Sequence, residues 1–136
     1  MNTDIIARLQ GILANIDQLG DRLTLLHEDQ MSEVRDQSGQ AVVSAYAACQ
    51  HCTSAKLSLA GVKSLLFNAE AVPFPGPQGQ TNTEQNQEWF AMRCHDTAAP
   101  LGITCDEVAI AILDAAQDHY FTAHEAWIEA QVCAAM

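Results

Sequence analysis

Basic residues are scarce in this chain. Its 136 residues include six lysines and arginines against 17 aspartates and glutamates, which gives a formal net charge of −11. No lysine or arginine follows Arg93, so the last third of the chain is anionic apart from its histidines. Because such a charge repels polyanions, we expect no direct binding to nucleic acid.

Several features that would identify a compartment are missing. No apolar run reaches the roughly 18 residues that a membrane-spanning helix needs, and residues 1–4 lack the basic and apolar stretches of a signal peptide. We therefore expect a soluble cytoplasmic protein that does not contact membranes. The five cysteines are an odd number and cannot all pair within one chain, which favours reduced thiols.

Motifs of catalysis are absent as well. The chain has no glycine-rich phosphate loop, no H-E-x-x-H and no G-x-S-x-G. The adjacent Cys94 and His95 do not form a nucleophile–base pair on one helix, because neighbouring helical residues point about 100° apart. We assign no catalytic residue and expect a binding protein rather than an enzyme.

The chain is rich in aliphatic residues and alanine, with 49% hydrophobic residues but only 6% aromatic ones. Such a core suits closely packed helices. The clearest helix is predicted over residues 3–36, with Thr3 as a candidate N-cap, because apolar residues recur there at alternating four- and three-residue steps. These residues are Ile5, Leu9, Ile12, Ile16, Leu19, Leu23 and Leu26.

Three more helices are predicted, over residues 40–71, 82–98 and 104–134. Prolines and Gly76 separate the second from the third, and Pro100 is expected to stop the third. Two capping boxes, Thr81 with Glu84 and Thr104 with Glu107, mark helix starts. The predicted fold is all-α: one domain over residues 1–136, an elongated antiparallel four-helix bundle with one shorter helix and a Pro-rich loop.

The last helix carries an unusual outward stripe in which carboxylates alternate with large apolar residues. A merely solvated helix face rarely holds so many large apolar side chains, so we interpret the stripe as a surface for a protein partner or for self-association. The predicted partner-binding residues are Asp114, Asp118, Phe121, Glu125, Ile128 and Glu129.

A second interpretation concerns cysteine and histidine. Two cysteines three residues apart on a helix share a face and offer two thiolates to Zn or Cu, and neighbouring helices would have to supply the other ligands. The candidate metal ligands are Cys49, His51, Cys52, Cys94, His95 and Cys105. The alternative is that these cysteines are core residues. His119 is expected to be a structural histidine near the inner side of its helix, and residues 27–29 a solvated polar edge.

The leading functional hypothesis is a non-enzymatic acidic binding protein, such as an inhibitor, adaptor or immunity-like protein, that engages a basic partner surface and forms a homo-oligomer. No cofactor is expected under this hypothesis. The alternative is a bundle that binds a metal or sequesters a small ligand around Cys49 and Cys52. A pocket near Trp89 and residues 73–80 is a third possibility.

Overall fold

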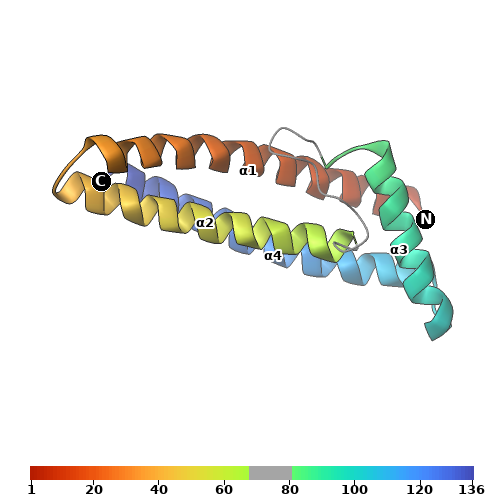
Figure 1. Cartoon of the computed structure of the whole chain (residues 1–136). Coiled ribbons are helices and arrows are strands. Elements are labelled where there is room, and N and C mark those ends of the chain that lie inside the picture. Colours follow the sequence, from red (N-terminus) through yellow and green to blue (C-terminus); the bar gives the residue numbers. More distant parts are fainter. Residues whose placement is uncertain (68–80) are drawn as a thin grey trace.

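The computed structural model describes residues 1–67 and 81–136 and confirms an all-α bundle (Figure 1). Within the described residues the secondary structure consists of α1 (Thr3–Asp36), α2 (Gln40–Leu66), α3 (Glu84–Leu101) and α4 (Cys105–Ala134). None of these helices combines the length and the hydropathy that crossing a membrane requires.

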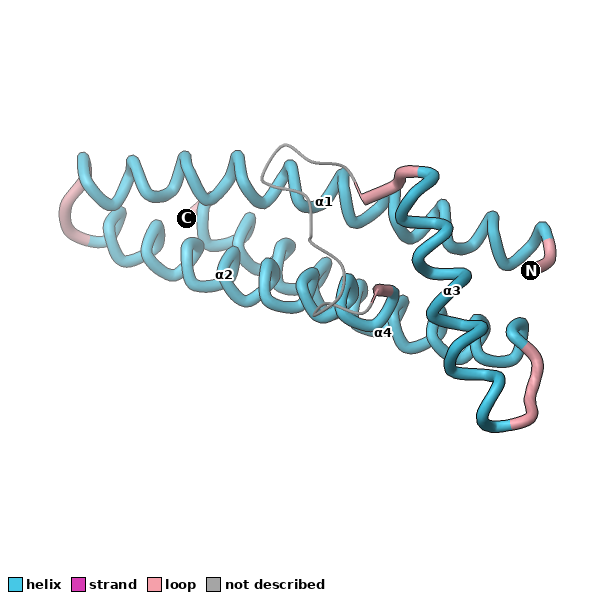
Figure 2. Tube along the Cα trace, turned by 45° about the vertical axis from the view of Figure 1, so that its right-hand side comes forward, coloured by secondary structure: helices cyan, strands magenta, loops and turns pink. Residues whose placement is uncertain are grey.

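Three long helices form a rod, and the short one lies across its end. Helices α1 and α4 run in the same direction along the rod, and α2 runs in the opposite direction (Figure 1). Helix α3 crosses the end at which α1 and α4 begin, as the rotated view also shows (Figure 2). The predicted shorter helix therefore closes one end of the bundle and leaves the other three to form its length.

The core contains two kinds of side chain. Helix α1 contributes the large aliphatic residues of its predicted stripe, of which Ile5 to Leu23 are buried and Leu26 is partly buried. Helix α4 contributes alanine at every seventh position, and all four of these residues are fully buried: Ala109, Ala116, Ala123 and Ala130. Helix α2 adds further small residues, including Ala48, Cys52 and Ala55. Small side chains let helices approach closely, so α2 and α4 pack tightly.

Helices α1 and α4 each begin with a side-chain cap. The N-cap of α1 is Asn2 and not the predicted Thr3, because the Asn2 side chain accepts a hydrogen bond from the Ile5 amide at 2.9 Å. At α4 the predicted capping box is confirmed: Thr104 accepts from the Glu107 amide, and the Glu107 carboxylate accepts from the Thr104 amide.

The start of α3 differs from the prediction. Thr83 is the N-cap, and its side chain accepts from the Asn86 amide. The predicted cap, Thr81, is fully buried; both its hydroxyl and its amide donate to the carboxylate of Asp17 on α1. A contact between distant parts of the chain thus occupies Thr81, and the helix begins two residues later.

The ends of α2 and α3 also differ from the prediction. Helix α2 ends at Leu66, since Phe67 is extended and its ring is buried in the core; residues 68–71 and the Pro-rich loop lie outside the described residues. Helix α3 continues through Pro100 to Leu101. Gly102 caps the end of the helix, and its φ of 67° is in the left-handed region that glycine adopts readily. The Ile103 and Gly102 amides then donate to the last carbonyls, which completes a Schellman motif.

Candidate functional site

The outward side of α4 is an exposed mixture of carboxylates and large apolar side chains. It lies opposite the buried alanines, because a helix that buries one stripe must turn the opposite stripe to solvent. Phe121 is 53% exposed and Ile128 44% exposed. We call the following residues the α4 outer face: Ile110, Asp114, Asp118, Phe121, Glu125, Ile128, Glu129 and Val132, all of which are exposed.

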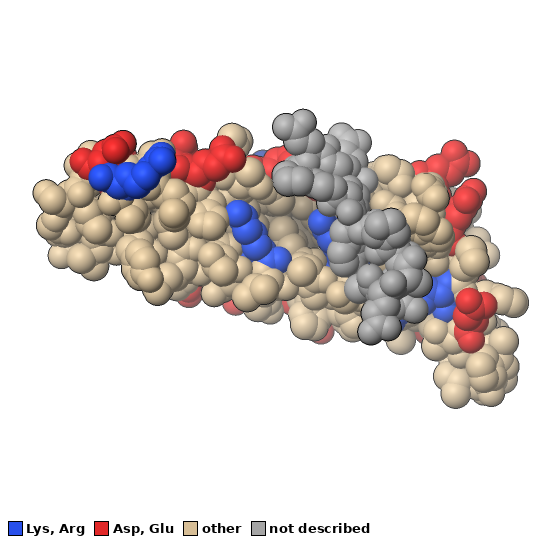
Figure 3. All heavy atoms as spheres, in the orientation of Figure 1, with Lys and Arg blue, Asp and Glu red and all other residues tan. Residues whose placement is uncertain are grey.

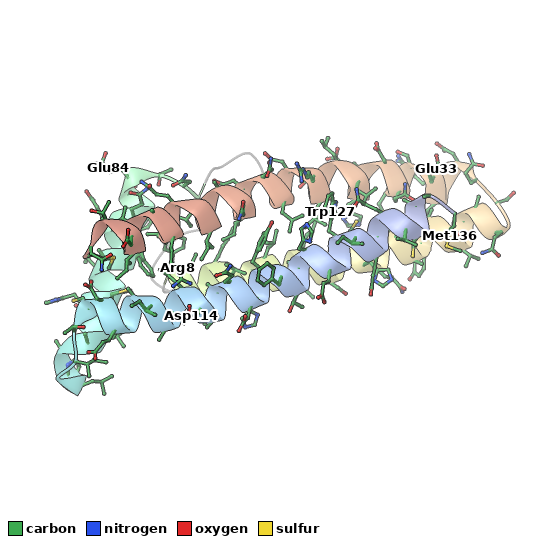
Figure 4. All side chains as sticks on the ribbon, turned by 180° about the vertical axis from the view of Figure 1, so that it is seen from behind. Arg8, Glu33, Glu84, Asp114, Trp127 and Met136 are labelled. Carbon is green, nitrogen blue, oxygen red and sulfur yellow. The ribbon has the colours of Figure 1, made fainter. Side chains whose placement is uncertain are left out.

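Two carboxylates of this face are held by neighbouring helices. Asp114 accepts from Arg8 of α1 at 2.8 Å (Figure 4), and Glu129 lies 3.2 Å from Nδ1 of His51 on α2. In contrast, Asp118 and Glu125 form no ion pair with any described residue. The structure therefore brings all six predicted residues onto one exposed stripe, on which the charges of Asp118 and Glu125 are not paired within the described residues.

A row of aromatic rings adjoins the outer face at the boundary between α4 and α1. The rings of Tyr120, His124 and Trp127 contact one another in sequence, with centroids 6.1 and 5.4 Å apart. Phe121 contacts Tyr120 at 6.1 Å and so connects the row to the outer face. The guanidinium of Arg22 on α1 lies 5.4 Å from the centroid of Trp127, which is within the range of a cation–π interaction.

This row was missed in the sequence. Its signal is the spacing of residues 120, 124 and 127, which places the rings on one side of α4. The partner, Arg22, is one of only six basic residues, but nothing local to it indicates a contact with the other end of the chain. Trp127 in turn lies between α1 and α4 (Figure 4).

The predicted metal ligands do not form one set. Cys49 and Cys52 are buried in α2, where burial raises the pKa of both thiols. Their neighbour His51 pairs with Glu129 instead of completing a ligand set. Among the described residues, no three histidines, cysteines or carboxylates are grouped as a metal would require.

Of the other three candidate ligands, His95 of α3 and Cys105 of α4 lie in contact. The Cys105 sulfur lies 3.7 Å from Nδ1 of His95, on the exposed surface. Cys94 is fully buried beside them, and burial, followed by the proximity of Cys105, raises its pKa to about 11. A thiol with that pKa stays protonated at neutral pH and is a poor nucleophile.

Two smaller expectations concern His119 and Trp89. His119 is exposed rather than part of the core, although its ring lies over Gly61 of α2, 3.6 Å from the position of an added Cβ. Trp89 is partly buried against the core. The loop proposed to form a pocket with it, residues 73–80, lies outside the described residues.

Comparison of the chain with protein families, with curated proteins and with solved structures finds no match. No activity is carried over from another protein.

Proposed function

We propose that the protein is a non-enzymatic acidic binding protein whose α4 outer face engages a basic surface of a protein partner. One observation carries the proposal: Phe121 and Ile128 are about half exposed beside Asp118 and Glu125, whose carboxylates have no ion pair among the described residues. Apolar residues inside a polar rim are the arrangement of protein interfaces, and the free carboxylates steer a basic partner.

The distribution of charge supports the same proposal. After Arg93 every charged residue other than histidine is acidic, so α4 contains no basic side chain to neutralise its own face. In the part of the chain that the structure describes, Arg8 of α1 and His51 of α2 form ion pairs with it. An inhibitor, an adaptor or an immunity protein acts through such a surface. All five cysteines are free, which supports a place in the reducing cytoplasm.

The test uses a fluorescent amphipathic peptide of leucine and lysine, with a control peptide in which glutamate replaces lysine. We expect the lysine peptide to bind, by fluorescence anisotropy, and the glutamate peptide not to bind. Phe121→Ala should weaken binding by about tenfold, the size of a typical interface anchor, without lowering the melting temperature. A large loss of stability would instead show that Phe121 belongs to the core.

A pair of charge-reversal variants separates the face from the net charge. Asp118→Lys with Glu125→Lys removes the two free carboxylates, whereas Asp36→Lys with Asp96→Lys makes the same change in net charge at exposed positions on α1 and α3. We expect only the first pair to abolish binding. Equal losses in both would mean that bulk charge alone attracts the peptide. Sedimentation of the same proteins measures self-association, and a dimer that Phe121→Ala dissociates would assign the face to a second copy.

A further inference from the structure

A pocket lies between the C-terminal half of α1 and the middle of α2, and no residue of the α4 outer face lines it. Its volume is about 370 Å³, which is within the range of roughly 300–1,000 Å³ that small-molecule sites occupy. Residues of α1 from Thr24 to Arg35 form one wall, and Lys56 of α2 forms the other. The pocket therefore has the volume of a small-molecule site and is open to solvent along one side.

This pocket concentrates positive charge in a protein that has little of it. Two of the six basic residues line it, Arg35 and Lys56, and neither forms a salt bridge with any described residue. Arg35 donates to the Ser32 hydroxyl at 3.1 Å, and Lys56 donates to Nδ1 of His27 at 2.8 Å. Both side chains keep further N–H groups to donate. Basic side chains are visible on this face of α1 and α2 (Figure 3).

His27 adds a donor without adding charge. An ammonium group can only donate hydrogen bonds, so Nδ1 of His27 accepts the hydrogen bond from Lys56 and Nε2 carries the ring hydrogen. Burial and the charge of Lys56 both lower the pKa of His27, which keeps the ring neutral at pH 7. Residue 27, expected to be part of a solvated edge, is thus a lining residue of the pocket.

The charges of the lining residues select a ligand. Arg35 and Lys56 contribute two positive charges and Glu28 one negative charge, which leaves one positive charge for the ligand to balance. Met31 provides an apolar wall. A phosphate dianion would overshoot this balance within a protein whose net charge is already −11. We propose that the pocket binds a small organic monocarboxylate, with its carboxylate against Arg35 and Lys56 and its apolar part against Met31.

The test titrates the full chain with hexanoate and follows backbone amides by NMR. We expect saturable shifts of the amides of residues 24–35 and 56. Arg35→Gln and Lys56→Met should each weaken binding about tenfold, the effect of losing one charge-assisted hydrogen bond. Arg93→Gln is the matched control, since Arg93 lies on α3 and donates to the Ser64 carbonyl outside the pocket. It should bind hexanoate as the native chain does.

Two further ligands decide the chemistry. 1-Hexanol has the same chain without the charge and should produce no saturable shift; equal binding of hexanol would overturn the carboxylate assignment. Inorganic phosphate should compete weakly, and tighter binding of phosphate than of hexanoate would show a phosphate site instead. Absence of hexanoate shifts, or hexanoate binding that both variants leave unchanged, would also overturn the proposal. Arg35 is exposed, so its variant should keep the fold, which circular dichroism checks.

Discussion

Helix α4 packs against α2 and against α1 in two different ways. Toward α2 it presents fully buried alanines, and α2 presents small residues such as Ala48 and Cys52. Toward α1 it presents Tyr120 and Trp127, and α1 extends the long side chains of Arg8 and Arg22 across the boundary. The first interface contains small buried side chains that pack closely, whereas the second includes long side chains that can change rotamer.

This difference bears on where a partner can bind. A tightly packed pair of helices fixes the backbone of α4 and so keeps its outer face in one orientation. The boundary with α1, which adjoins Phe121 through the ring of Tyr120, is the part that can adapt. We therefore expect substitutions on the α2 side to change stability most, and those on the α1 side progressively less.

The largest effect is expected from Ala123→Leu. Ala123 is fully buried, and a larger side chain there would have to push α2 and α4 apart, at a cost of about 3 kcal/mol of unfolding free energy. Ala111→Leu is the matched control on the exposed side of α4 and should change stability by less than about 0.5 kcal/mol. Urea titration measures both. A similar small effect in both variants would show that the α2 interface is not tightly packed.

The next effect is expected from Trp127→Ala on the α1 side. Trp127 is only partly buried, so loss of its packing should cost about 2 kcal/mol of unfolding free energy. A double-mutant cycle with Arg22→Met should give a coupling energy of about 0.5–1 kcal/mol from the cation–π contact. A coupling energy of zero would mean that Arg22 does not stabilise the boundary.

A third test measures how the buried thiols of α2 make the stability depend on pH. Burial raises the pKa of the Cys49 and Cys52 thiols above that of an exposed cysteine. As the pH rises, the folded chain therefore keeps these protons after the unfolded chain has lost them. The resulting stabilisation is present below pH 9 and is lost as the pH rises above it. Cys52→Ala should flatten the alkaline decline in unfolding free energy. Cys133→Ala changes a half-buried position near the end of α4 and should leave more of this alkaline decline than Cys52→Ala does.

The smallest effect is expected at the ion pair of Arg8 with Asp114. The two side chains are 38% and 64% exposed, so their coupling energy should be about 0.5 kcal/mol or less. High salt should remove it, because the Debye length falls to about 3 Å at 1 M ionic strength. A cycle of Arg8→Gln and Asp114→Asn measures the coupling. A coupling energy that does not fall at high salt would show that this boundary is far more rigid than the exposure of its side chains indicates.

Local patterns in the sequence predicted most of the helices but not all of their ends. The start of α4 was predicted because Thr104 and Glu107 cap each other within four residues. The predicted start of α3 was wrong because the choice between Thr81 and Thr83 as its N-cap depends on Asp17, which is more than 60 residues away along the chain. Pro100 was expected to stop α3, yet the left-handed Gly102 ends the helix two residues later.

The exposed stripe on α4 was predictable because it depends only on helical periodicity. The grouping of the cysteines and histidines was not, since it depends on which levels of different helices meet. Cys49 and Cys52 lie on α2, whereas Cys94 lies within α3 and Cys105 is the first residue of α4. For the same reason the pocket around Lys56 and His27 had no local signal.

The common direction of α1 and α4 has an electrostatic consequence. Each helix start carries the equivalent of about half a positive charge from its aligned peptide dipoles, and these two starts lie side by side, joined by the Asn2 amide and the Asp106 carboxylate at 3.4 Å. Asp4, Asp106 and Glu107 lie in the first turns, so the two dipoles together offset about one of their three negative charges. Asp118 and Glu125, in the middle of α4, lie beyond the reach of either helix start and face solvent with their full negative charge.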